Sequence, residues 1–194
     1  MVGGEGVSTE ADYWKANNGY DYNAMFKGAY VDEFAAQESW LAGRVRPGLK
    51  VLELGCGPGR LAKVLSDKCI YSGTDISTEM TRPLVNAILS GLPATLLRHG
   101  TVPKKQFDVA FCVSVLIHVP PENLAATLGE LSAAARKEIW LVENKQHAGE
   151  SLRTGGDHGG CWAHDYGKHV PEGWRMSATV DLCRTHDAYV LVPS

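Results

Sequence analysis

The chain has 194 residues, of which 44% are hydrophobic and 21% are charged. This length corresponds to one domain, and the composition excludes a disordered or collagen-like chain. With a net charge of −3, the chain has no overall basic field to attract a nucleic acid or an anionic membrane.

The first residues and the cysteines indicate the cellular compartment of the protein. The chain begins Met-Val-Gly-Gly-Glu-Gly, without the basic and apolar regions of a secretory signal. The longest apolar run, 109–117, is too short to cross a bilayer. The cysteines are odd in number and form no Cys-x-x-Cys pair: Cys56, Cys69, Cys112, Cys161 and Cys183. This usage favours a reducing compartment and therefore a cytoplasmic protein with neither membrane nor nucleic acid as a partner.

Short apolar runs alternate with segments of helical periodicity along most of the chain. Two amphipathic helices are predicted before residue 50, at about 9–16 and 30–41. Beyond them, the predicted strands are 50–54, 70–75, 95–98, 107–113 and 138–142. The predicted helices between them are 60–66, 77–89 and 123–135. Apolar strands separated by helices are typical of a parallel sheet covered on both faces.

The end of the chain breaks this alternation. Two further strands are predicted at 174–183 and 188–192, with only a few residues between them. So short a connection has no room for a crossover helix, so these strands should be antiparallel. We therefore predict a three-layer α/β sandwich, whose mostly parallel seven-stranded sheet ends in an antiparallel hairpin.

A glycine-rich turn follows the first predicted strand of the sheet. It contains an acidic residue and three alternating glycines: Glu53, Gly55, Cys56, Gly57 and Gly59. Ligands of open parallel sheets bind beyond the carboxyl ends of the strands, and glycine lets the backbone approach a ligand closely. The turn is therefore the first place to seek a binding site.

Two nucleotide-binding motifs do not fit this turn. A P-loop closes with Gly-Lys-Ser/Thr, whereas the sequence here is Pro58-Gly59-Arg60. The dinucleotide fingerprint needs a third glycine where Arg60 stands.

The pattern Glu-x-Gly-x-Gly-x-Gly resembles the first motif of class I methyltransferases, which use S-adenosylmethionine. Asp75 ends the second strand, as the acidic residue of that family does, and 76–80 resembles the family's following segment. The strand 107–113 with its continuation to His118, and the terminal strand pair, are also similar. The resemblance covers 47–143 and implies a Rossmann-like fold with S-adenosylmethionine as cofactor.

The resemblance implies a set of cofactor-binding residues. Asp75 is expected to hold the two ribose hydroxyls, because a carboxylate accepts two hydrogen bonds at once. The segment 97–100 lacks the carboxylate that often contacts adenine, so backbone groups, His99, or Ile76 and Met80 are expected to replace it. The candidates are Glu53, Gly55, Cys56, Gly57, Gly59, Asp75, Ile76, Met80, His99, Gly100, Ser114, Val115 and Tyr20.

Candidate bases are the histidines near the expected acceptor. In order of preference they are His164, His147 and His118, because a histidine of near-neutral pKa can remove a proton from the acceptor. His118 has an alternative interpretation, as a structural residue of its loop. The late cluster of histidines with Cys161 lacks the paired spacing of zinc modules, so no metal is predicted.

The predicted organisation is a single domain, 1–194. It divides into a helical cap (1–46), a cofactor-binding core (47–143), an acceptor-side loop (144–173) and the terminal hairpin (174–194). The expected reaction is O-methylation of a small polar molecule, such as a sugar or a natural-product intermediate, by a monomer or homodimer. The alternatives are a non-catalytic partner or regulatory protein that binds S-adenosylmethionine, and a nicotinamide-dependent dehydrogenase.

Overall fold

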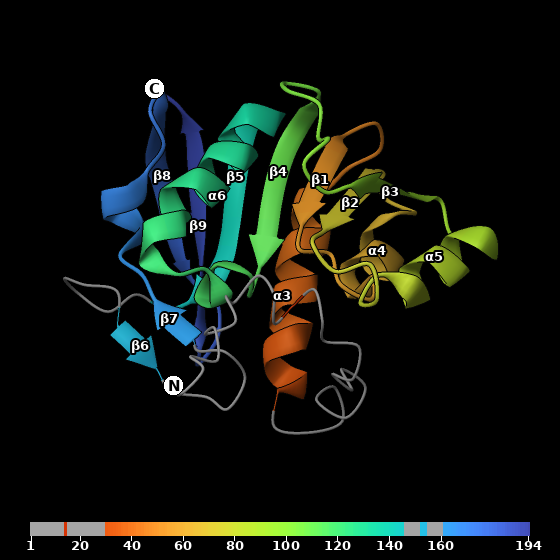
Figure 1. Ribbon diagram of the computed structural model, residues 1–194, viewed down its shortest axis with the longest axis horizontal. Helices are drawn as coiled ribbons and strands as arrows, with labels where there is room; N and C mark the ends of the chain where they lie inside the picture. The colour runs from red at the N-terminus through yellow and green to blue at the C-terminus, as the bar shows by residue number, and fades with distance from the viewer. Residues whose placement is uncertain (1–13, 15–29, 146–151, 155–160) are drawn as a thin grey trace, which may run out of the picture.

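The computed structural model describes residues 14, 30–145, 152–154 and 161–194 (Figure 1). In chain order the elements are α3 (Val31–Arg44), β1 (Lys50–Leu54), α4 (Arg60–Leu65), β2 (Ile70–Asp75), α5 (Arg82–Leu89), β3 (Ala94–Arg98), β4 (Phe107–Val113), the 3-10 turn η1 (Leu116–His118), α6 (Pro121–Ala134), β5 (Ala135–Asn144), β6 (Leu152–Thr154), β7 (Cys161–Ala163), the 3-10 turn η2 (Tyr166–His169), β8 (Trp174–Asp181) and β9 (His186–Pro193). In these described segments, no helix is both long and apolar enough to cross a membrane.

The main sheet has seven strands in the order β3-β2-β1-β4-β5-β9-β8. Strands β1 to β5 pair in parallel, whereas β9 is antiparallel to both β5 and β8. This arrangement confirms the predicted fold class, including the antiparallel hairpin. Strand order reverses between β1 and β4, so a crevice is expected beyond the carboxyl ends of these two strands.

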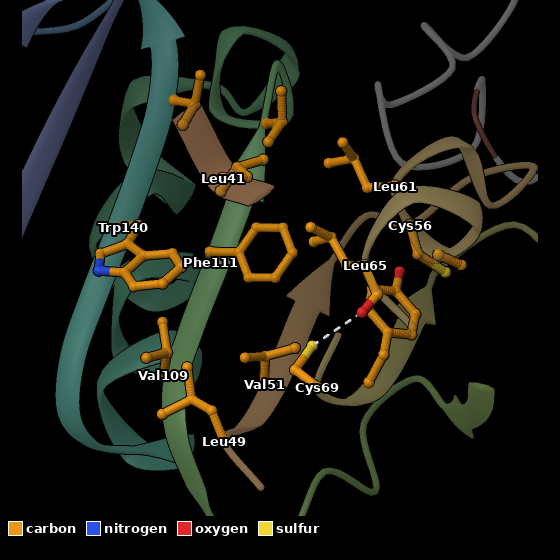
Figure 2. Close-up of a cluster of buried hydrophobic side chains, with 14 of the residues drawn as sticks. Leu41, Leu49, Val51, Cys56, Leu61, Leu65, Cys69, Val109, Phe111 and Trp140 are labelled. Atoms are coloured by element: carbon orange, nitrogen blue, oxygen red, sulfur yellow. Dashed lines mark hydrogen bonds between the residues drawn. The ribbon is translucent and has the colours of Figure 1, made fainter. Parts of the chain in front are cut away.

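Alternating side chains of the central strands build two separate cores. Phe111 and Val109 of β4 face α3 and α4, where they pack in one cluster with Leu41 and Leu61. Figure 2 shows Phe111 pointing toward Leu65 of α4, with Trp140 of β5 on its other side. Side chains at the intervening positions of β4 pack instead against the leucines of α6. Period-two alternation therefore places helices on both faces of the sheet.

Figure 1 shows the two groups of helices on different parts of the sheet. Helix α6 lies over the half with β5 and β9, and α4 and α5 lie beside β2 and β3. Residues 99–106, between β3 and β4, form no helix. Beyond the carboxyl ends of the strands, α6 can therefore form one wall of a cavity.

Two of the predicted segments lie at the ends of the core. The predicted helix 9–16 lies outside the described residues, except for Trp14, which is helical. The stretch 144–173, expected to be irregular, contains the small antiparallel pair β6 and β7 and the turn η2. Strands of three residues are too short to show a periodicity in the sequence.

Candidate functional site

A cavity of about 520 Å³ lies where β1 and β4 end, between the glycine turn and α6. Its volume is within the range of small-molecule sites. Nine of the predicted residues line it: Gly55, Gly57, Asp75, Ile76, Met80, His99, Ser114, Val115 and His118. Helix α6 adds Glu122, Asn123, Thr127 and Glu130.

The first and third positions of the turn require glycine, because neighbouring side chains lie too close for a Cβ atom. Gly55 has φ +74°, and a Cβ atom there would lie 2.4 Å from Cγ2 of Val115. Gly59 has φ +83°, and its Cβ would lie 2.7 Å from Cδ1 of Leu84. Only glycine avoids both the clash and the backbone strain. The turn can therefore lie directly against the segment after β4 and against α5.

Asp75 connects the glycine turn with the segment after β2. Its Oδ2 accepts a hydrogen bond from the Gly57 N–H, and its Oδ1 accepts one from the Ser77 N–H, each at 2.8 Å. Burial raises the pKa of Asp75, although these two amide bonds oppose the shift. Each carboxylate oxygen keeps a further lone pair, and the residue lines the cavity. Asp75 can therefore shape the turn and bind a ligand hydroxyl at the same time.

Four predicted cofactor residues do not line the cavity: Glu53, Cys56, Gly59 and Gly100. Glu53 shares the α4 face of β1 with Val51, since side chains alternate along a strand. There it accepts a hydrogen bond from the Tyr71 hydroxyl, and burial raises its pKa to about 7. Cys56 is buried against Gly73, where a Cβ atom would lie 2.8 Å from the Cys56 Cβ. These side chains support the turn from behind.

Glu143 holds the turn that follows β4, and the sequence reasoning missed it. Its Oε1 accepts hydrogen bonds from the N–H groups of Val115 and Leu116 at 3.0 and 3.1 Å, and its Oε2 accepts one from Ile117 at 3.4 Å. Glu143 is fully buried, and burial raises its pKa to about 7. An acidic residue that ends an apolar strand, at the same sheet edge as Asp75, is the signal that could have indicated it.

His164 holds the same turn from its other end. Its Nε2 donates to the carbonyl oxygens of Leu116 and Val119, at 3.0 and 2.9 Å. The side chain is 0% exposed and does not line the cavity, and burial lowers its pKa. Both bonds hold the turn from a side chain that lies outside the cavity lining, so His164 has a structural role, and its predicted role as a base stays a prediction.

His118 is the predicted base that the structure places at the cavity. Its Nδ1 lies 4.0 Å from the Cys161 Sγ, and its ring centroid lies 4.7 Å from that of Trp14. The side chain is half-buried. His147 and Tyr20, the remaining predictions, lie outside the described residues.

Comparisons with known proteins agree with this geometry. Residues 51–138 match the family model described as a methyltransferase domain. A curated relative, the magnesium-protoporphyrin O-methyltransferase of Synechocystis, is 29% identical over 101 residues. That match spans 49% of this chain and 44% of the relative, so the chain matches less than half of the relative's length. The family match confirms the resemblance found in the sequence.

Solved structures extend the likeness of the fold to nearly the whole chain. The Synechocystis magnesium protoporphyrin IX methyltransferase with bound S-adenosylmethionine has a TM-score of 0.70 at 20% identity, covering 97% of this chain and 99% of its own. The complex of DhpI with S-adenosylmethionine and HEP has a TM-score of 0.66 at 20% identity, with 93% and 94% covered. At such identities the likeness concerns the fold.

Proposed function

We propose that this chain, which carries a methyltransferase domain over residues 51–138, transfers a methyl group from S-adenosylmethionine to a small polar molecule. The observation that carries the proposal is the carboxylate of Asp75, bonded to the glycine turn and facing a cavity of about 520 Å³. Solved neighbours of the same fold hold S-adenosylmethionine or its demethylated product.

The residues present fit this cofactor. Asp75 keeps lone pairs for the ribose hydroxyls after its two amide bonds are made. Ile76 and Met80 offer an apolar surface to the adenine, and the bare backbone of Gly55 and Gly57 permits close approach. The bound cofactor would supply an electrophilic methyl group on its sulfonium. The protein's own task is then to align the acceptor and to exclude water.

His118 is the candidate general base in this proposal. It lies at the end of η1 and faces the cavity, and Glu143 and His164 fix the turn that carries it. A histidine in this position can accept the proton that an acceptor hydroxyl loses on methylation. We therefore propose O-methylation, with a sugar or a natural-product intermediate as the class of acceptor.

Calorimetry with S-adenosylmethionine, S-adenosylhomocysteine and a nicotinamide cofactor tests the proposal. We expect the first two to bind, and we expect Asp75→Ala to weaken both about 100-fold, since bonds to a charged carboxylate are among the stronger hydrogen bonds. Asp108→Ala is the matched control, because Asp108 lies at the opposite end of the strands and bonds to the Lys50 N–H. Binding of the nicotinamide cofactor alone would overturn the proposal.

The non-catalytic alternative needs a separate measurement. A panel of hydroxylated small molecules, incubated with protein and S-adenosylmethionine, should yield a product heavier by one methylene group in intact-mass analysis. Cofactor binding without such a product across sugars and natural-product intermediates would favour the regulatory alternative.

The state of the cysteines supports a cytoplasmic location within this proposal. No disulfide joins any of the five cysteines in the described residues, and Cys56, Cys69 and Cys112 are buried in the two cores. Free buried thiols suit a reducing compartment.

A further inference from the structure

A histidine of the terminal hairpin is hydrogen-bonded to a serine that lines the cavity. Antiparallel pairing of β9 with β5 sets His186 opposite Asn144, at the carboxyl end of β5. From there the Nε2 of His186 lies 2.8 Å from the Oγ of Ser114, which lines the cavity at the end of β4. The Nδ1 of His186 lies 2.8 Å from the Oγ1 of Thr185. The three side chains form one hydrogen-bonded chain that ends at the cavity.

Ser114 is held in a costly backbone conformation. Its φ is +54°, a region that non-glycine residues avoid at a cost of roughly 1–3 kcal/mol. Its N–H donates to the Val142 carbonyl at 2.9 Å, so the strained residue is tied to β5 from the backbone as well as from the side chain. Such strain persists where the surrounding structure fixes one geometry, and it gathers at functional sites.

The charge state of the histidine defines what the serine can offer. Burial lowers the pKa of His186 to about 4, so its ring is neutral near pH 7, with one donor nitrogen and one acceptor nitrogen. When Nδ1–H donates a hydrogen bond to Thr185 Oγ1, Nε2 is left to accept a hydrogen bond from the Ser114 hydroxyl. The lone pairs of Ser114 Oγ then remain for a ligand that donates a hydrogen bond.

The charges around the cavity favour a Ser114 hydroxyl that donates to His186 over one that accepts from His186. The charged side chains that line it, within the described part of the chain, are the carboxylates Asp75, Glu122 and Glu130, with no lysine or arginine. A cavity lined in this way attracts a cationic group. An oxygen that offers lone pairs suits such a group, whereas a hydroxyl that offers its proton would suit an anion.

We propose that His186 is a positioning residue, which sets Ser114 Oγ as the hydrogen-bond acceptor for the ammonium group of the bound cofactor. The inference rests on the proposed function, in which Asp75 takes the ribose. The strand order β2-β1-β4 sets the turn with Gly55 between Asp75, at the end of β2, and Ser114, after β4, and all three residues line the cavity. The amino-acid end of the cofactor would therefore point to Ser114.

The test compares two ligands that differ only in the ammonium group: S-adenosylhomocysteine and its desamino analogue. Calorimetry should show that Ser114→Ala weakens S-adenosylhomocysteine about tenfold, the effect of losing one charge-assisted hydrogen bond. The desamino analogue should bind the variant and the wild type equally. Ser132→Ala is the matched control, since the Ser132 hydroxyl donates to the Gly129 carbonyl within α6 and Ser132 does not line the cavity, and it should alter neither affinity.

Variants of the two supporting residues separate positioning from general stability. His186→Phe keeps a ring but removes the acceptor, and it should reproduce the selective loss seen with Ser114→Ala. His186→Gln offers an amide oxygen and should restore most of the affinity for S-adenosylhomocysteine. Thr185→Val should cause a smaller selective loss. In the double variant Ser114→Ala/His186→Phe the losses should not add, because both act on one hydrogen bond.

Each result decides for or against the inference. Equal weakening of both ligands by Ser114→Ala or His186→Phe would overturn it, as would full affinity of both variants for S-adenosylhomocysteine. If the wild type binds both ligands with equal affinity, the ammonium group has no partner here and the inference fails while the proposed function stands. If the wild type binds neither S-adenosylmethionine nor S-adenosylhomocysteine, the proposed function itself fails, and the inference fails with it.

Discussion

Where the parallel strands begin, Asp108 accepts the Lys50 N–H and pairs with Arg136 and Lys137. Where they end, Glu143 accepts three successive amides of a turn and pairs with no cation among the described residues. The pKa of Asp108 is lowered, with the Lys50 amide as the largest cause and the two cations assisting. The pKa of Glu143 is raised to about 7 by burial.

One sheet thus uses acidic groups for two purposes. At the first edge the two cationic side chains are about half exposed, so the carboxylate joins neighbouring strands at modest energetic cost. At the second edge the carboxylates bond to loop backbone, and the shape of the loop depends on them. The cavity lies at this second edge.

The largest expected effect is that of removing the buried carboxylate. Glu143→Ala should lower the free energy of unfolding by about 4 kcal/mol, because three amides lose their acceptor and a small void forms. Urea denaturation measures the change. Glu143→Gln is the control, since its remaining oxygen can keep the bonds to Val115 and Leu116. If both variants lost equal stability, the carboxyl group would not hold the turn through these bonds.

The pH dependence of stability should have opposite signs at the two edges. Glu143 has its pKa raised from 4.5 to about 7, so its contribution is fully present below about pH 4.5 and is lost as pH rises through 7. The loss should be on the order of 3 kcal/mol. Unfolding measured from pH 4.5 to 8 should show a smaller decline for Glu143→Gln. Glu53, with a similar raised pKa, should account for a decline that persists in the variant.

Variants of two histidines at the second edge should distinguish an effect on stability from an effect on turnover. His164→Phe removes the donor to two carbonyls and should cost about 2 kcal/mol of stability, while the pH profile of turnover keeps its shape. His118→Gln should leave stability within about 0.5 kcal/mol and reduce turnover at least tenfold. Thermal unfolding and steady-state kinetics, measured on both variants, distinguish the two roles. A loss of turnover without loss of stability in His164→Phe would instead support His164 as the base.

The smallest effect is expected at the first edge. Asp108→Asn keeps an oxygen for the Lys50 N–H but removes the charge, so it should cost about 1 kcal/mol at pH 7. Because the pKa of Asp108 is lowered from 3.8, this contribution is present above that value and lost as pH falls further. Wild type and variant should therefore converge in stability as pH falls below 3.8. A loss as large as that of Glu143→Ala would remove the contrast between the edges.

Several elements were predictable because their signals are local. The strand 107–113 is β4 residue for residue, and the short link before β9 predicted the antiparallel hairpin. The glycine turn and Asp75 were predictable because positive φ and a carboxylate at a strand end leave marks in adjacent residues. By contrast, the direction of the Glu53 side chain depends on which face of β1 meets α4.

By itself, the sequence determined the order of strands and helices, the class of fold and the glycine-turn end of the cavity, because periodicity and turn chemistry act over a few residues. Only the tertiary structure decided the tasks of the buried polar groups. It brought Glu143 and His164 to one turn and His186 to Ser114 across separations of 26 to 72 residues. Such partners carry no local signal, since a hydrogen bond between distant residues depends on sheet order and register.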